Sequence, residues 1–109
     1  MQHEPSDRAQ TVETLSRAIS EWRMVRATYN GAEMALAPHQ LFVRHDALFV
    51  SAFNPGKNWR GPEDYRLSYF NIAGLGGVAL QDNGFKPLDG FDSSLPRPED
   101  QLLLALEAA

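Results

Sequence analysis

Cysteine is absent from this 109-residue chain. Without thiols the chain can form neither disulfides nor thiolate metal sites, and its composition suits a reducing compartment. Long apolar runs are missing too, since none approaches the roughly 20 residues that a membrane-spanning helix needs. The N-terminal stretch MQHEPSDRAQ also lacks the apolar centre of a signal peptide. We therefore expect a cytoplasmic protein that makes no contact with a membrane.

A net positive charge is missing as well, because the formal net charge is −4. This balance argues against a protein that simply coats nucleic acid, which needs clustered Lys and Arg side chains. The charge is uneven along the chain. Residues 22–70 hold six basic against four acidic residues, whereas residues 71–109 hold two basic against six acidic residues. We expect a mildly basic middle and an acidic tail.

Motifs for metal binding, cofactor binding and catalysis are also missing. The histidines His3, His39 and His45 have no i, i+4 helical spacing and no neighbouring carboxylate pattern. The stretch GLGG at residues 74–77 precedes a predicted strand, whereas a phosphate-binding loop opens a helix. No GxSxG elbow or cysteine nucleophile is present. We expect no metal, no cofactor and no enzymatic activity.

The residues that are present suit one small domain. Hydrophobic residues make up 43% of the chain and charged residues 22%, as in globular rather than disordered proteins. A chain of this length buries roughly 65% of its unfolded surface, which is enough for a single core. Val12, Leu15, Ile19 and Trp22 recur at intervals of three or four residues. This spacing predicts an amphipathic helix over residues 9–22.

Alternating apolar residues then predict five short strands between Met24 and the end of the stretch GGVALQDNG. Asn30-Gly31 is a strong signal for a two-residue hairpin turn, and His45-Asp46 predicts a second tight turn. Pro38 cannot donate to a ladder, so we expect a bulge or bend there. No helical pattern separates the strands, which favours a mainly β fold with a small closed or half-open barrel.

The tail differs from the rest of the chain. Residues 1–8 read as a flexible N-terminus, residues 9–92 as the domain, and residues 93–109 as a linker followed by a short C-terminal helix. Pro98, Glu99 and Asp100 make a favourable first helical turn before the leucine-rich QLLLALEAA. Such a helix is apolar around most of its surface. It either packs on the N-terminal helix or joins two copies as a homodimer.

Two places in the chain are candidates for ligand binding. Trp59 and Arg60 are adjacent in a polar loop, where an aromatic ring beside a guanidinium can stack on a planar ligand. A tryptophan folded back onto the barrel explains the pair equally well. Arg66 falls within the predicted strand YRLSYF, where a guanidinium needs an anionic partner. That partner is either a ligand or an internal acid such as Glu63 or Asp64.

The order of these features resembles the WYL domain. The matching segments, in order, are TLSRAISEW, ATYNG, APHQLFVRHDALFVSAFN, DYRLSYFNIAGL and GFKPLDGFD, from about Leu15 to Phe91. The resemblance implies a five-stranded Sm/SH3-like barrel in which residues 48–50 take the place of the family's Trp-Tyr-Leu. Tyr29 matches the first-strand Tyr, His39 belongs to the proline motif, and Arg66 matches the Arg of the family's FRL-like strand.

The chain also departs from the family pattern. The signature Trp and Tyr are replaced by Leu48 and Phe49, and SYFN stands where the family has a second Asp-Arg pair. These changes remove positive charge and stacking surface from the pocket that the resemblance implies. No helix-turn-helix pattern precedes the barrel in this sequence. If the chain is a regulator, DNA binding must therefore come from a partner regulator protein, or the chain works as a free-standing module.

Two functional hypotheses follow. In the first, the chain is a ligand-sensing regulatory module of WYL type, in transcriptional or defence regulation, that binds single-stranded nucleic acid or a nucleotide-like anion. Its predicted ligand-binding residues are Tyr29, His39, Trp59, Arg60 and Arg66. In the second, the barrel is only a scaffold, and the C-terminal helix serves dimerisation or docking in a non-enzymatic assembly protein.

Overall fold

The computed structural model of the chain describes residues 4–106, with side chains from residue 8 onward. The helix α1 (Glu4–Glu21) is followed by strands in one sheet, so the predicted mainly β class is confirmed. Residues 1–3 of the predicted N-terminus, including His3, and residues 107–109 of the predicted C-terminal helix lie outside this description. The strands are β1 (Arg23–Tyr29), β2 (Ala32–Arg44), β3 (Ala47–Phe53), β4 (Ser68–Asn71), β5 (Leu75–Gly84) and β6 (Gln101–Ala105).

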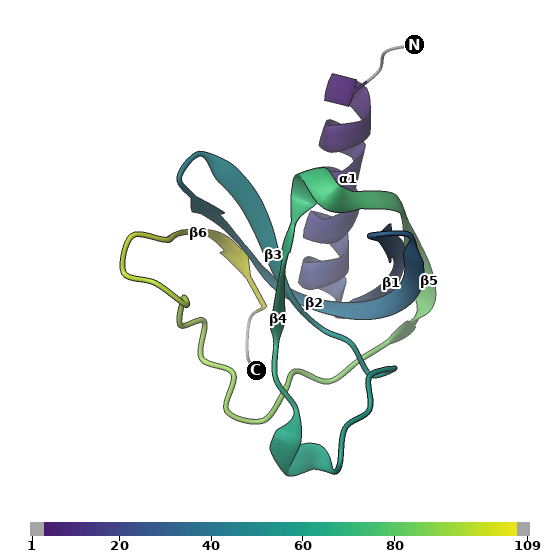
Figure 1. The fold of residues 1–109 in the computed structure, drawn as a ribbon, viewed down its shortest axis with the longest axis vertical. Coiled ribbons are helices and arrows are strands. Elements are labelled where there is room, and N and C mark those ends of the chain that lie inside the picture. Colours follow the sequence, from purple (N-terminus) through teal and green to yellow (C-terminus); the bar gives the residue numbers. More distant parts are fainter. Residues whose placement is uncertain (1–3, 107–109) are drawn as a thin grey trace.

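The predicted N-terminal helix is present and places its apolar side on the sheet. It begins at Glu4, five residues before the predicted start at Ala9. Leu15 and Ile19 are fully buried, and they pack with buried residues of β1, β2 and β3 in a single core. Figure 1 shows α1 packed against the sheet, and the part of the sheet that contains β1 and β5 curves round the helix. No described helix has the length and apolar character needed to cross a membrane.

Both predicted hairpin turns form. Asn30 and Gly31 adopt φ values of 52° and 79°, and the flanking residues Tyr29 and Ala32 pair across β1 and β2. Positive φ at both central positions is what a type I′ turn requires. His45 and Asp46 likewise have φ values of 50° and 65°, and they join β2 to β3. Local turn chemistry therefore sets the two antiparallel registers on either side of β2.

The long strand β2 is shared by two parts of the sheet. The strand order is β4-β3-β2-β1-β5, all pairings are antiparallel, and β6 pairs with β2 off this path. The register with β3 shifts between Pro38 and Gln40, which is the predicted irregularity at Pro38. Residues 4–106 contain six strands where five were predicted, and their sheet is not closed into a barrel.

The predicted C-terminal helix is wrong for the residues that the structure describes, because residues 101–105 form β6. β1 pairs with β2 only as far as Leu36, so β1 does not cover the edge of β2 at residues 40–43. Gln40, Leu41 and Phe42 are buried, so their main-chain groups need hydrogen-bond partners there. β6 supplies these partners, whereas a helix of so few residues is marginal by itself.

An ion pair attaches the segment before β6 to β2. Nε of Arg44 donates to Asp100 Oδ1 at 2.9 Å, and Nη2 donates to Oδ2 at 3.0 Å. The carboxylate of Asp100 also accepts the Arg97 main-chain N–H at 3.1 Å. The guanidinium of Arg44 and these hydrogen bonds hold the pKa of Asp100 below its usual range. This bidentate pair fixes the start of β6, while Figure 1 shows the preceding connection running round the outside of the molecule.

Asp100→Asn should loosen β6 selectively, because it leaves the Arg44 guanidinium without an anionic partner in a largely enclosed position. We expect faster hydrogen exchange at the amides of residues 101–106, while the amides of β1 keep their protection. Glu21→Gln removes the half-exposed carboxylate that contacts Arg17 and Arg23, far from β6 in the sequence, and serves as the control. Unchanged exchange in β6 would show that strand pairing alone holds this segment.

Candidate functional site

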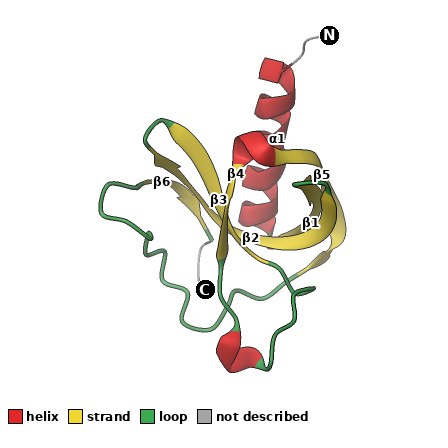
Figure 2. Ribbon diagram, viewed as in Figure 1, coloured by secondary structure: helices red, strands yellow, loops and turns green. Residues whose placement is uncertain are grey.

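Two loops at one end of the sheet border an open cavity of about 640 Å³. One wall comes from the connection between β3 and β4, which contains the short 3-10 helix η1 (Pro62–Asp64), and the other comes from the segment after β5. Figure 2 shows both loops at the lower end of the molecule. We call this cavity the loop pocket. Its lining residues are Met24, Ala37, Phe53, Pro55, Pro62, Glu63, Tyr65, Arg66, Phe85, Lys86, Pro87, Leu88 and Asp89.

An aromatic cluster forms one wall of the loop pocket. The rings of Phe53 and Tyr65 lie with centroids 4.7 Å apart, and both line the cavity. Trp59 supports them from behind, stacked on Phe53 at 5.6 Å and edge-on to Tyr65 at 5.6 Å. The indole Nε1 of Trp59 donates to the Asn54 carbonyl at 2.8 Å. Trp59 therefore positions the pocket wall, as the fold-back interpretation of this residue predicts.

Charged side chains of both signs line the pocket. Arg66 and Lys86 contribute positive charge from opposite walls, and Glu63 and Asp89 contribute negative charge. The Arg66 guanidinium is exposed and donates to the carbonyls of Glu63 at 3.3 Å and Tyr65 at 3.1 Å. Within the described part of the chain no carboxylate lies within ion-pair distance of Arg66 or Lys86. Both cations are therefore available to an anionic group that enters the pocket.

His39 is fully buried and anchors the second wall. Its Nδ1 lies 2.8 Å from the Ala37 carbonyl, and its Nε2 accepts the main-chain N–H of Leu88 at 3.0 Å. The imidazole also stacks on Phe85 at 5.3 Å. Burial lowers the pKa of His39, which matches a neutral ring with Nδ1–H as donor and Nε2 as acceptor. His39 thus holds residues 85–88 in place and does not line the cavity itself.

Only one of the five predicted binding residues lines the loop pocket, and that residue is Arg66. Arg66 lies outside β4, which begins at Ser68, because η1 turns the chain just before it; the predicted mid-strand position is therefore wrong. Tyr29 packs edge-on against Phe70 with centroids 5.0 Å apart. A methyl group on Gly74 would lie 2.9 Å from the Tyr29 ring, so this half-buried Tyr packs closely against the edge of the core. Arg60 is exposed in the loop and does not line the cavity.

Sequence reasoning missed Lys86 and Tyr65 as pocket residues. Lys86 lies in GFKP, directly after β5. In the sequence this stretch indicates only the resemblance to the WYL pattern. A lysine between an aromatic residue and a proline at the end of a strand can indicate a pocket residue, because the chain leaves the sheet at that point and enters a loop. The other ionisable groups add no metal site, since no cluster of three potential ligands occurs among the described side chains.

Comparison with known proteins gives a match in fold only. No protein family matches the sequence, and no curated protein matches it. Among solved structures, the chain is similar to the proteasome accessory factor B/C (PafBC) of Arthrobacter aurescens, with a TM-score of 0.64 and 13% identity. The match covers 77% of this chain and 13% of PafBC, so the chain spans a small part of that protein's length. At this identity the similarity concerns the fold.

Proposed function

We propose that this chain is a ligand-sensing regulatory module whose loop pocket binds a nucleotide-like anion or a short stretch of single-stranded nucleic acid. The observation that carries the proposal is the cavity of about 640 Å³, lined by Arg66 and Lys86 together with the rings of Phe53, Tyr65 and Phe85. Aromatic faces stack on bases, and guanidinium and ammonium groups receive phosphates. The pocket combines both kinds of group within one site.

The fold supports a regulatory role. PafBC is a regulator that contains a WYL domain, and this chain resembles the WYL pattern in sequence order from about Leu15 to Phe91. In this proposal the divergent barrel-like sheet is the sensing element, it acts in the cytoplasm, and it binds without turnover. The output then passes to a partner regulator protein.

The charges of the pocket determine how the ligand binds. Glu63 and Asp89 offset the formal charge of Arg66 and Lys86, so the pocket has no net attraction for a phosphate backbone. Specific contacts to the two cations must therefore supply the affinity. Because few phosphates are neutralised and the cations are open to solvent, we expect weak binding that declines measurably but not steeply as the salt concentration rises.

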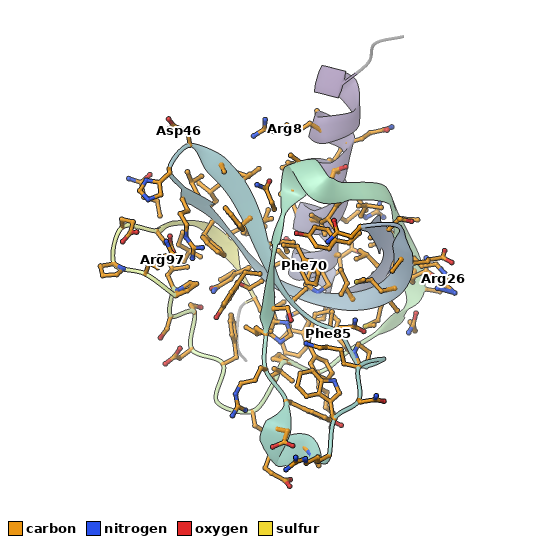
Figure 3. All side chains as sticks on the ribbon, viewed as in Figure 1. Arg8, Arg26, Asp46, Phe70, Phe85 and Arg97 are labelled. Atoms are coloured by element: carbon orange, nitrogen blue, oxygen red, sulfur yellow. The ribbon has the colours of Figure 1, made fainter. Side chains whose placement is uncertain are left out.

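Arg66→Ala should reduce the affinity for a labelled oligonucleotide or nucleotide at least about tenfold, because hydrogen bonds to charged groups contribute about 1.5–3 kcal/mol. Lys86→Ala should have a similar effect, and neither change should lower thermal stability much. Arg26→Ala is the matched control, since this exposed Arg lies on β1, away from the loop pocket. Figure 3 shows Arg26 at the side of the molecule and Phe85 just below its middle.

Titration by fluorescence anisotropy at low and physiological salt measures these affinities. Tight binding that does not respond to salt would contradict the electrostatic basis of the proposal. An equal loss of affinity in Arg26→Ala and Arg66→Ala would place the ligand outside the loop pocket.

A further inference from the structure

Strand β6 is an edge strand with a free backbone side. One side of β6 pairs with β2 over residues 40–43, and the Leu106 N–H continues this pairing to the His39 carbonyl at 2.8 Å. On the other side, no strand or main-chain group among residues 4–106 pairs with it. Unpaired N–H and C=O groups in an extended strand are a template for another strand.

The side chains of β6 make this edge unusually apolar. Leu103 is 56% exposed and Leu102 is 44% exposed, whereas Leu106 is buried in the core. The register shift between Leu41 and Phe42 leaves Leu103 without a direct partner on β2. The strand QLLLA contains no charge, proline or glycine, which are the residues that protect natural edges. Two large aliphatic side chains therefore face solvent beside a free ladder.

The other two edges of the sheet differ from β6. β4 has four residues, which makes it too short for an extended ladder. β5 carries Asp82 and three glycines, and α1 packs against it more extensively than against β6. Of the edges in the described part of the chain, β6 is the one that offers both free main-chain groups and exposed aliphatic side chains.

The charges around β6 indicate which kind of strand can pair with its free edge. Asp100 is neutralised by Arg44, so the acidic residue directly before the strand already has a partner within the chain. Glu99 lies 3.6 Å from His45, and this contact is an ion pair only when His45 is protonated. A charged partner strand finds no opposite charge in β6, whereas an identical neutral strand meets no like charge there. A second copy also continues the antiparallel order β4-β3-β2-β6 across a two-fold axis.

We propose that β6 of one copy pairs antiparallel with β6 of a second copy, so that two sheets join into one continuous sheet. Leu102 and Leu103 of both copies lie at this junction. The contact is short, since β6 has five residues, and such an interface falls below the roughly 1,200 Å² of a standard stable complex. The dimer should therefore form reversibly, in the micromolar range or above.

Light scattering of the full chain from micromolar to millimolar concentration tests this proposal. We expect the mass to rise from 12.2 kDa towards twice that value. Leu103→Lys should weaken the association at least tenfold, because two like charges then meet near the axis. Ala79→Lys places the same charge at an exposed position on β5 and should leave the association unchanged.

A second measurement uses only wild-type chains, so it tests the proposal even if a lysine variant folds poorly. In a mixture of differently isotope-labelled wild-type chains, nuclear Overhauser contacts between β6 strands of different copies should appear at high concentration. A chain that stays monomeric at millimolar concentration overturns the proposal. Association that survives Leu103→Lys, or that grows beyond two copies, overturns it as well. Loss of this dimer leaves the loop pocket intact, so ligand titration distinguishes the two proposals.

Discussion

Phe42→Ala should lower the free energy of unfolding by about 3–5 kcal/mol, the range for removing a fully buried aromatic side chain. Phe42 is 0% exposed and lies near the C-terminal end of β2, between its partner strands β3 and β6. Its ring stacks on Phe49 at 5.5 Å, and the Arg44 guanidinium lies 5.4 Å from its centre. Truncation leaves a cavity beneath the ion pair that attaches the start of β6. Urea unfolding followed by circular dichroism measures the loss.

Tyr69→Ala is the matched control for this change. Tyr69 is edge-on to Phe42 at 6.1 Å but is 46% exposed, so its removal opens no closed cavity. We expect a clearly smaller loss of stability than for Phe42→Ala. Equal losses for the two variants would mean that the outer aromatic residues, and not the buried side chain of Phe42, stabilise this face of the sheet.

His39→Phe should destabilise the chain and disturb the loop pocket at the same time. The phenyl ring keeps the stacking on Phe85 but cannot bond to the Ala37 carbonyl or the Leu88 N–H. Each buried main-chain group left without a partner costs about 1–3 kcal/mol. We therefore expect a lower melting temperature and changed chemical shifts for residues 85–89, which include pocket residues. His45→Asn, at an exposed turn position, should change neither property.

The same histidine should make stability depend on pH. Burial lowers the pKa of His39 in the folded chain below the ordinary value of 6.5. As the pH falls below that value, the unfolded chain binds a proton before the folded chain does, so the free energy of unfolding decreases. The full contribution is present above pH 6.5 and declines below it, down to the folded pKa. Urea unfolding between roughly pH 7 and pH 5 measures this slope, which spans the titration of histidine. The slope should be reduced in His39→Phe, and an unchanged slope would assign it to other groups.

His39 also explains why a residue outside the cavity matters for binding. It bonds through both ring nitrogens, so it fixes Leu88 relative to Ala37, and both of these residues line the loop pocket. Trp59 has the same kind of role on the opposite wall, through Phe53 and Tyr65. Two of the predicted binding residues are thus positioning residues, and substitutions there should alter binding through the shape of the walls.

Local interactions along the chain were sufficient to predict much of the fold. The apolar spacing around Leu15 and Ile19 predicted α1, because a helix face is set by residues three and four apart. Asn30-Gly31 and His45-Asp46 predicted the two hairpins, because turn geometry depends on the φ values that these few residues can adopt. Pro38 predicted the irregularity in β2 for a similarly local reason, its missing N–H.

Tertiary contacts alone determine that the tail forms a strand and which residues line the loop pocket. Residues 101–105 form a strand because the buried edge of β2 at residues 40–43 needs main-chain partners, and this need arises from residues about 60 positions away. Arg66 and Lys86 line the same pocket because β3, β4 and β5 bring their loops to one end of the sheet. His39 is buried because segment 85–91 folds over it. In each case the deciding contact joins residues far apart in the chain, which periodicity and turn signals do not encode.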